Sequence, residues 1–413
     1  MINLLFKGVT LFSLRASQSV FNFLILVLFT NILADAPLAD LLFLLSLITV
    51  GARFAVFGLD VVLLKSYSSG AEPAVVFSST LTGFLLLWCA LALALVFAPF
   101  DLLSPLAILW LFLASLQVFQ SSTLLALSRQ GAGFLTGGAL SSGLVLVSLL
   151  ACLALNILID LELFIAINTV VLAANLLVAQ WLIFQSTGLP DRPKLTLVKQ
   201  LAPSTFIAAL TNLLLYTSSH IPLWFLVAFA SDTAVVNYGV AFRFTVALGM
   251  VLEVSRALIL PRFAQSLHQK TLPEAEPTIR QISTLAALVT AALSLLVLQF
   301  SDLIFGEIFN RAGQPVFWVA FWLLASQSLL AALGPGHMAL RVGGQHTLAF
   351  GLSLGSTLVL GAAMFALYPI NGPSGIAFAV FATTLGFGLT HLALVKHHFN
   401  ILTSFTLRPR HGG

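Results

Sequence analysis

The chain has 413 residues, of which 59% are hydrophobic and only 8% are charged, and its mean hydropathy is +1.06. A soluble domain carries roughly 25% charged residues, so this composition excludes a water-soluble protein and predicts a polytopic membrane protein. The net charge of +4 does not indicate a nucleic-acid partner, and the only two cysteines, Cys89 and Cys152, lie in apolar stretches and cannot form a disulfide framework.

Apolar segments long enough to cross a bilayer follow one another along the whole chain. A spanning helix needs about 20 mostly apolar residues, and breaks at Pro, Gly and charged clusters separate the candidates. The sequence predicts an all-α protein with twelve spans: 9–33, 38–64, 74–98, 104–127, 132–157, 163–185, 202–230, 234–260, 279–304, 315–340, 346–368 and 374–396.

The cationic residues between the spans predict the orientation. If the N-terminus is cytoplasmic, the outside loops hold only Arg311, and the inside segments hold Lys7, Lys65, Arg129, Arg192, Lys194, Lys199, Arg262, Lys270, Arg280, Arg341, Lys396, Arg408 and Arg410. Because cytoplasmic loops are enriched in Lys and Arg, both termini are expected in the cytoplasm and the protein in the inner (plasma) membrane.

The cationic loop 186–201 divides the spans into two sets of six with the same orientation. We therefore expect an N-terminal lobe over residues 1–190 and a C-terminal lobe, with a short cytoplasmic tail, over residues 191–413. Parallel repeats of this kind occur in transporters, where the substrate site lies between the halves.

Six ionisable side chains fall inside the predicted spans: Arg15, Arg53, Asp60, Arg243, Glu253 and Arg256. A charge at the centre of a bilayer costs about 2.5–3.5 kcal/mol on insertion scales, so such residues usually face a bundle interior or a water-filled path. Arg53 and Asp60 are seven residues apart, which predicts one helix face, and Glu253 and Arg256 are three apart, which allows a direct ion pair.

Arg53 and Arg243 occupy the second span of each half, and neither has an acid within one helical turn. Together with Arg15 they are the candidate substrate-binding residues of a central cavity, with snorkelling or structural pairing as the alternatives. Guanidinium groups stay charged when desolvated and bind phosphate through a planar fork. An anionic ligand such as a pyrophosphate-linked lipid fits this set.

Gating or ion coupling is the second candidate role for polar residues within spans. Asp60, Glu253 and Arg256 are the charged candidates, and His220 and Asn212 are the neutral ones; each can instead serve only in helix packing. Gly334, Pro335 and Gly336 interrupt the tenth span, either as a hinge or as a passive kink.

Enzymatic motifs are missing from the sequence. It contains no Walker A sequence, no HExxH metal cluster and no discernible Ser/His/Asp set, and its loops are too short for a catalytic domain. A transporter is expected rather than a sugar polymerase or glycosyltransferase. No cofactor and no metal are expected, and a Na+ or H+ gradient is a candidate driving force.

Three stretches resemble the MOP (multidrug/oligosaccharidyl-lipid/polysaccharide) exporter superfamily. Residues 12–67, "FSLRASQSVF…LLKSY", resemble its first helical pair, with Gly58-Leu59 and Lys65 at the end. Residues 237–265, "NYGVAFRFTVALGMVLEVSRALILPRFAQ", resemble its eighth span, and residues 371–395, "NGPSGIAFAVFATTLGFGLTHLALV", resemble its last span.

The resemblance is to the polysaccharide and lipid-linked oligosaccharide flippase branch, which includes the lipid II flippases. It implies two six-helix lobes around a V-shaped central cavity, alternating access, and a polyprenyl-pyrophosphate-linked oligosaccharide carried to the outer leaflet for surface polysaccharide synthesis. Polysaccharide polymerase machinery is then a candidate partner, besides the bilayer itself. In lipid II flippases, cavity arginines lie on the first, second and eighth spans, which here carry Arg15, Arg53 and Arg243. An ion-coupled drug exporter of the same fold is the alternative.

The orientation can be tested by labelling single cysteines from each side of the membrane. Positions in residues 188–193 should react only from the cytoplasm, and positions in residues 231–233 only from outside, because the Lys and Arg bias places these loops on opposite faces. Labelling of both loops from one side would contradict the twelve-span topology.

Overall fold

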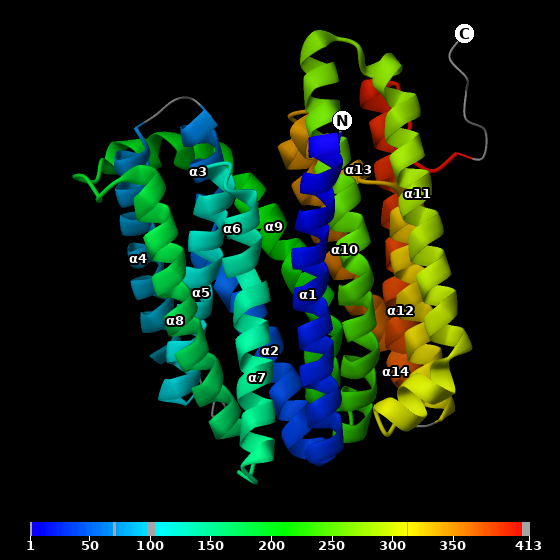
Figure 1. Ribbon diagram of the computed structural model, residues 1–413. Helices are drawn as coiled ribbons and strands as arrows, with labels where there is room; N and C mark the ends of the chain where they lie inside the picture. The colour runs from blue at the N-terminus through cyan, green and yellow to red at the C-terminus, as the bar shows by residue number, and fades with distance from the viewer. Residues whose placement is uncertain (1, 69–71, 97–103, 312, 407–413) are drawn as a thin grey trace. The chain divides into compact units, whose positions relative to one another are not determined.

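The computed structural model describes residues 2–68, 72–96, 104–311 and 313–406, and every regular element in these ranges is a helix (Figure 1). The helices group into two compact units, residues 1–220 and 221–413. The predicted all-α class is therefore confirmed.

The first unit contains α1 (Ile2–Ile32), α2 (Asp35–Val56), α3 (Leu59–Ser68), α4 (Pro73–Val96), α5 (Pro105–Ala126), α6 (Gln130–Phe134), the π-helical turn η1 (Leu135–Ala139), α7 (Leu140–Ala154) and α8 (Leu161–Thr187). Helix α9 (Leu195–Phe229) begins in the first unit and ends in the second. The second unit continues with α10 (Asp232–Gln269), α11 (Leu272–Gln299), the π-helical η2 (Asp302–Ile308), α12 (Gln314–Leu333), α13 (Gly336–Val342) and α14 (His346–Phe399).

Helix α14 contains both of the last two predicted spans. A straight helix of its 54 residues would measure about 80 Å, far more than the roughly 30 Å of a bilayer core. The backbone leaves helical geometry at Gly372, where φ is 55° and ψ is −139°, a conformation that only glycine adopts readily. Among the described residues, eleven helices are long and apolar enough to cross a membrane. With α14 counted as two arms, they give the twelve predicted spans.

The second predicted span, 38–64, is broken in the structure. Helix α2 ends at Val56 and α3 begins at Leu59, because Phe57 and Gly58 both have positive φ angles, 23° and 79°. The prediction that Arg53 and Asp60 share one helix face is wrong, since it assumed a continuous helix between them. Asp60 lies in α3, and its side chain lies outside the described part.

The fifth predicted span contains the π-helical turn η1, which frees backbone carbonyl groups that water cannot reach in a bilayer. Two side-chain amides from neighbouring helices satisfy one of them. The Thr136 carbonyl accepts hydrogen bonds from Gln117 Nε2 at 2.9 Å and from Asn175 Nδ2 at 2.7 Å. Polar residues of α5 and α8 therefore cap an irregular stretch of the next span.

Each unit is built around one central helix. Helix α5 packs against α2, α3, α6 and α8 in the first unit, and α12 packs against α10, α11 and α14 in the second. Aromatic side chains fill the first core, where the stacked rings of Phe84 and Phe119 have centroids 5.2 Å apart. In the second, Trp322 of α12 contacts Phe378 and Phe381 of α14.

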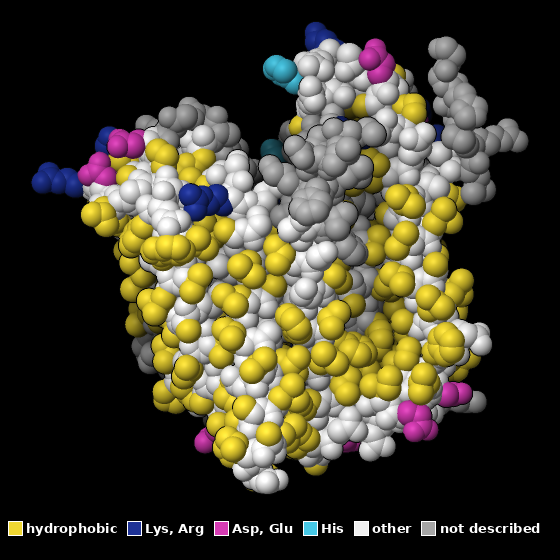
Figure 2. Space-filling model, in the orientation of Figure 1, with side chains coloured by type: hydrophobic (Ala, Val, Ile, Leu, Met, Phe, Trp, Pro, Cys, Tyr) yellow, Lys and Arg dark blue, Asp and Glu magenta, His cyan; other side chains and the backbone are white. Residues whose placement is uncertain are grey.

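Charged side chains are rare on the middle of the helices. On the face drawn in Figure 2, apolar side chains cover the middle of the helices, and the visible Lys and Arg side chains lie toward the helix ends at the top. Such a surface is suited to hydrocarbon along the middle and to water at the ends. The cytoplasmic placement of the termini stays a prediction.

The two compact units divide at His220 and Ile221, inside α9, rather than in the loop 186–201. This division reflects which helices pack together. The predicted lobe boundary at residues 190 and 191 came instead from dividing the predicted spans into two sets of six. The predicted lobes and their V-shaped cavity stay predictions.

Loss of the amides that bond the Thr136 carbonyl should destabilise the first unit. Asn175→Leu combined with Gln117→Leu leaves this buried acceptor without a partner, which costs about 1–3 kcal/mol. The midpoint of thermal unfolding in detergent should fall. Asn168→Leu on the same helix is the control, because among the described residues Asn168 bonds only the Phe164 carbonyl of its own turn. An equal fall in the control would contradict the capping role.

Candidate functional site

Arg53, in the last turn of α2, is held by an aromatic ring. Its guanidinium carbon lies 4.8 Å from the ring centroid of Tyr216 in α9, and both side chains are half-buried. A cation–π contact of this kind contributes about 0.5–1 kcal/mol when exposed and about 2 kcal/mol when desolvated. The contact uses the flat face of the guanidinium and leaves its N–H edges free to bind an anion.

Arg15, in α1, is held differently. Its Nη1 donates a 2.7 Å hydrogen bond to Gln18 Oε1, and its guanidinium carbon lies 6.0 Å from the ring centroid of Phe134. Helix α1 packs against α6, η1 and α7, and the Gln18 amide fills the space that a side chain on Gly138 of η1 would take. The absence of a side chain at Gly138 therefore makes room for the residue that orients Arg15.

Arg243 lies in α10, eleven residues after Asp232 and about 17 Å along the helix from its start, near the middle of a bilayer core. Its side chain is half-buried. In the part of the chain that the structure describes, no hydrogen bond and no ion pair joins Arg243 to another residue. Its chain neighbour Phe244 is buried against the rings of Phe305 and Phe309.

A charge held inside a membrane span without a counter-charge is costly, and a guanidinium group keeps its charge when desolvated. A bound anion would offset that cost. The structure thus places Arg15 and Arg53 in the first unit and Arg243 in the second, each within a predicted span.

Four of the predicted gating residues have described side chains. His220 Nδ1 lies 2.9 Å from the Tyr216 carbonyl and 2.9 Å from Ser219 Oγ, all on α9. Asn212 and Arg256 are half-buried, and Glu253 is exposed. A direct Glu253–Arg256 pair and the ion-coupling roles stay predictions. Within the described ranges, no group of three or more His, Cys, Asp or Glu residues could hold a metal ion.

The tenth predicted span breaks at Gly334, Pro335 and Gly336. Helix α12 ends at Leu333, Gly334 has a φ of +74°, and α13 begins at Gly336. Only glycine adopts this φ readily, and a side chain at Gly334 would also overlap the Thr403 carbonyl. The break itself is present, and its use as a hinge stays a prediction.

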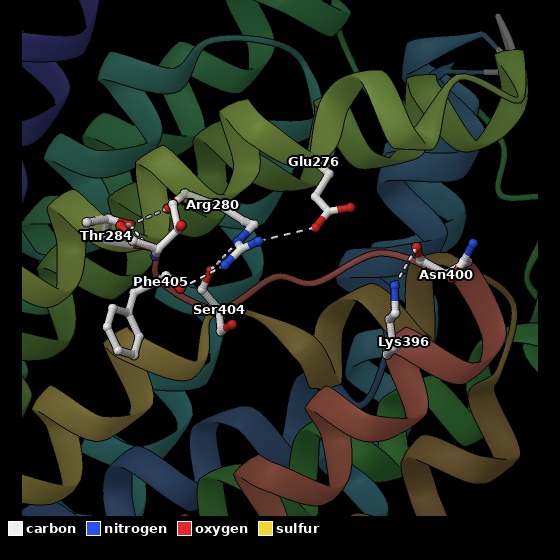
Figure 3. Close-up of polar contacts among 8 residues, drawn as sticks. Glu276, Arg280, Thr284, Lys396, Asn400, Ser404 and Phe405 are labelled. Atoms are coloured by element: carbon white, nitrogen blue, oxygen red, sulfur yellow. Dashed lines mark hydrogen bonds and ion pairs between the residues drawn. The ribbon is translucent and has the colours of Figure 1, made fainter. Parts of the chain in front are cut away.

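Residues 400–406, here named the C-terminal strap, satisfy the end of α12. Phe405 N donates to the Ala332 carbonyl at 2.8 Å, and Thr403 Oγ1 donates to the Leu333 carbonyl at 3.4 Å. Figure 3 shows Arg280 and Thr284 of α11 on the other side of the strap.

Arg280 donates to the carbonyls of Ser404 and Phe405, each at 3.4 Å, and pairs with Glu276 at 3.5 Å. Thr406 N donates to Thr284 Oγ1 at 2.9 Å. The strap therefore joins α11, α12 and α14 beside the helix break.

A pair of half-buried histidines, His337 of α13 and His391 of α14, was missed by sequence reasoning. Their ring centroids lie 5.9 Å apart with planes at 76°. Each is a single histidine in an apolar stretch, and they are far apart in the chain. No sequence spacing could reveal this pair.

The fold is shared with solved transporters of the MOP superfamily. An outward-facing multidrug resistance MATE family transporter superimposes with a TM-score of 0.68 at 13% identity, covering 95% of this chain and 94% of its own. A MOP superfamily transporter from Pyrococcus furiosus has a binding pocket of reversed polarity, which suggests a different function for it. It superimposes with a TM-score of 0.68 at 13% identity, covering 95% of this chain and 94% of its own. A MATE transporter from Vibrio cholerae superimposes with a TM-score of 0.64 at 14% identity, covering 95% of this chain and 97% of its own. The sequence matches no protein-family model and no curated protein.

A methyl group on Gly138 should displace the residue that holds Arg15. Gly138→Ala overlaps the Gln18 amide, and overpacking of this kind costs about 1–3 kcal/mol, so the thermal unfolding midpoint should fall. Adding Gln18→Ala should recover part of the loss because it vacates the space. Gly131→Ala is the control, since no atom lies within 4 Å of the added carbon. A double variant no more stable than Gly138→Ala would show that Gln18 is not the obstacle.

Proposed function

We propose that this protein is a membrane transporter that carries a polyprenyl-pyrophosphate-linked oligosaccharide to the outer leaflet by alternating access. The observation that carries the proposal is Arg243, a half-buried cation near mid-span with no ion pair in the described part of the chain. A pyrophosphate supplies the missing negative charge, and a bidentate guanidinium–phosphate contact is one of the stronger hydrogen-bonded pairs in proteins.

Arg53 and Arg15 serve in the proposal as the phosphate contacts of the first unit. Tyr216 holds Arg53 through its face, and Gln18 holds Arg15 through one N–H group. Neither of these two contacts is with an acid, and each guanidinium group keeps its positive charge. The fold, shared with superfamily transporters, supports a transport role in general.

A second candidate is an ion-coupled exporter of small molecules or drugs. Its support is that several of the similar structures are MATE transporters, including one described as a multidrug resistance MATE family transporter. The two functions make opposite demands on charge, because a cationic drug is repelled by arginines that attract a pyrophosphate. Transport of labelled lipid pyrophosphate and of a cationic dye, measured in the same proteoliposomes, separates them.

Substitution of Arg243 tests the proposal directly. Hydrogen bonds to charged groups contribute about 1.5–3 kcal/mol, so Arg243→Ala should lower the rate of lipid pyrophosphate transport about 10- to 100-fold. Arg243→Lys should retain part of the rate, since it keeps the charge and loses the fork, and Arg243→Glu should abolish transport.

The control is Arg262→Ala, an exposed cation on the same helix α10, which should transport at the wild-type rate. Expression and detergent stability of each variant are compared with the wild type. Transport by Arg243→Ala at the wild-type rate would contradict the proposal, and dye export without lipid transport would support the exporter.

A further inference from the structure

The histidine pair lies beside the break that separates α12 from α13. Helix α13 packs against α14 and α10, and a Cβ atom on Gly336 would lie only 3.3 Å from the Cβ of His391. The first turn of α13 therefore rests directly on α14 at His391. A change in the charge of either histidine ring would therefore affect the packing of α13 against α14.

Both rings have an unused nitrogen. The Nε2 atoms of His337 and His391 are buried and have no hydrogen-bond partner among the described residues. The ring of His391 is also hydrogen-bonded to the Phe387 backbone, one turn earlier in α14. Because His391 Nε2 has no partner, this bond uses Nδ1 as the donor, and Nε2 keeps its lone pair. A lone pair of this kind is where a proton would bind.

The groups that act on His337 are basic side chains. They are Arg341 on α13 itself, His391 on α14 and Arg256 on α10, so each element packed against α13 contributes a basic group. Burial of the ring nitrogen and the positive charge of the two guanidinium groups both disfavour a protonated ring. The packed arrangement therefore holds two neutral rings at neutral pH.

The direction of the pH effect follows from this lowered affinity for protons. A hydrated histidine titrates near 6.5, so the packed arrangement is favoured above that pH and loses its advantage as the pH falls below it. A proton binds a water-accessible histidine pair more tightly than a packed histidine pair. Protonation therefore shifts the population toward the arrangement that admits water. Once one ring is protonated, its N–H can donate to the neutral Nε2 of the other ring.

The helix break gives α13 a way to respond. Gly334 and Pro335 separate α13, seven residues long, from α12. The rest of α13 is anchored, because Ala339 and Leu340 are buried in a cluster with residues of α10, α11 and α14. Movement about the break can therefore be small, just enough to bring water to two rings.

We propose that His337 and His391 form a single proton-binding site, and that binding of the proton shifts α13 away from α14 at the helix break. If the protein transports as proposed above, this proton is the ion that couples transport to a gradient. Only that last step rests on the proposed function. The proton is taken up and released without any other reactant.

Hydrogen exchange of the α13 backbone amides, measured by mass spectrometry in nanodiscs, tests the proposal. Labelling times are scaled for the pH dependence of intrinsic exchange. Between pH 8.0 and pH 5.5, the exchange rate of residues 338–342 should rise at least fivefold in the wild type. The rise should be absent in His337→Gln/His391→Gln, because the amides are similar in size and stay neutral at both values.

The control is His397→Gln, an exposed histidine on the same arm of α14, which should respond like the wild type. If the double variant does not fold, each single variant should show less than half of the wild-type rise. A flat wild-type profile, or an undiminished rise in the double variant or in both single variants, would overturn the proposal. Since exchange requires no substrate, a protein that shows the rise but moves no lipid pyrophosphate contradicts only the proposed function.

Discussion

Every backbone polar group that leaves regular helix inside a bilayer needs a partner from the protein, and the architecture of both units depends on that requirement. In the first unit, Gln117 and Asn175 supply the partners for the π-helical turn at Thr136. In the second, the C-terminal strap supplies them for the end of α12. Polar residues, which are unfavourable in a bilayer, are thus placed where helices are interrupted. Their hydrogen bonds stabilise the backbone at these interruptions.

Arg53 and Arg243 differ from these amides, because no acidic partner is described for either of them. Arg53 rests on a ring, and Arg243 has no ion pair among the described residues. A side chain used only for packing would be better served by an apolar residue of similar volume, since a buried charge is destabilising unless paired. The same reasoning applies to the histidine pair, whose unused nitrogens lie in a buried contact. In both cases, the unsatisfied group is better explained by an external partner than by stability.

Sequence reasoning predicted the helical class and the number of spans because hydropathy and helix length are local properties. It failed where local geometry changes within a span. The break at Phe57–Gly58 was hidden because "FGL" sits inside an unbroken apolar run, and the Arg53–Asp60 spacing argument failed with it. Contacts such as Arg53 with Tyr216, or His337 with His391, join residues from helices far apart in the chain. They depend on how helices pack, which composition and periodicity do not encode.

The C-terminal strap also determines the order in which the second unit can be completed during synthesis. Thr403 bonds the Leu333 carbonyl across 70 residues of sequence, so α12 is made well before its end can be capped. At the usual elongation rate of about 5–20 residues per second, that interval lasts roughly 4–14 seconds. For that time the terminal carbonyls of α12 must be hydrated or held by the insertion machinery. The second unit therefore closes late, when both arms of α14 are already in the membrane.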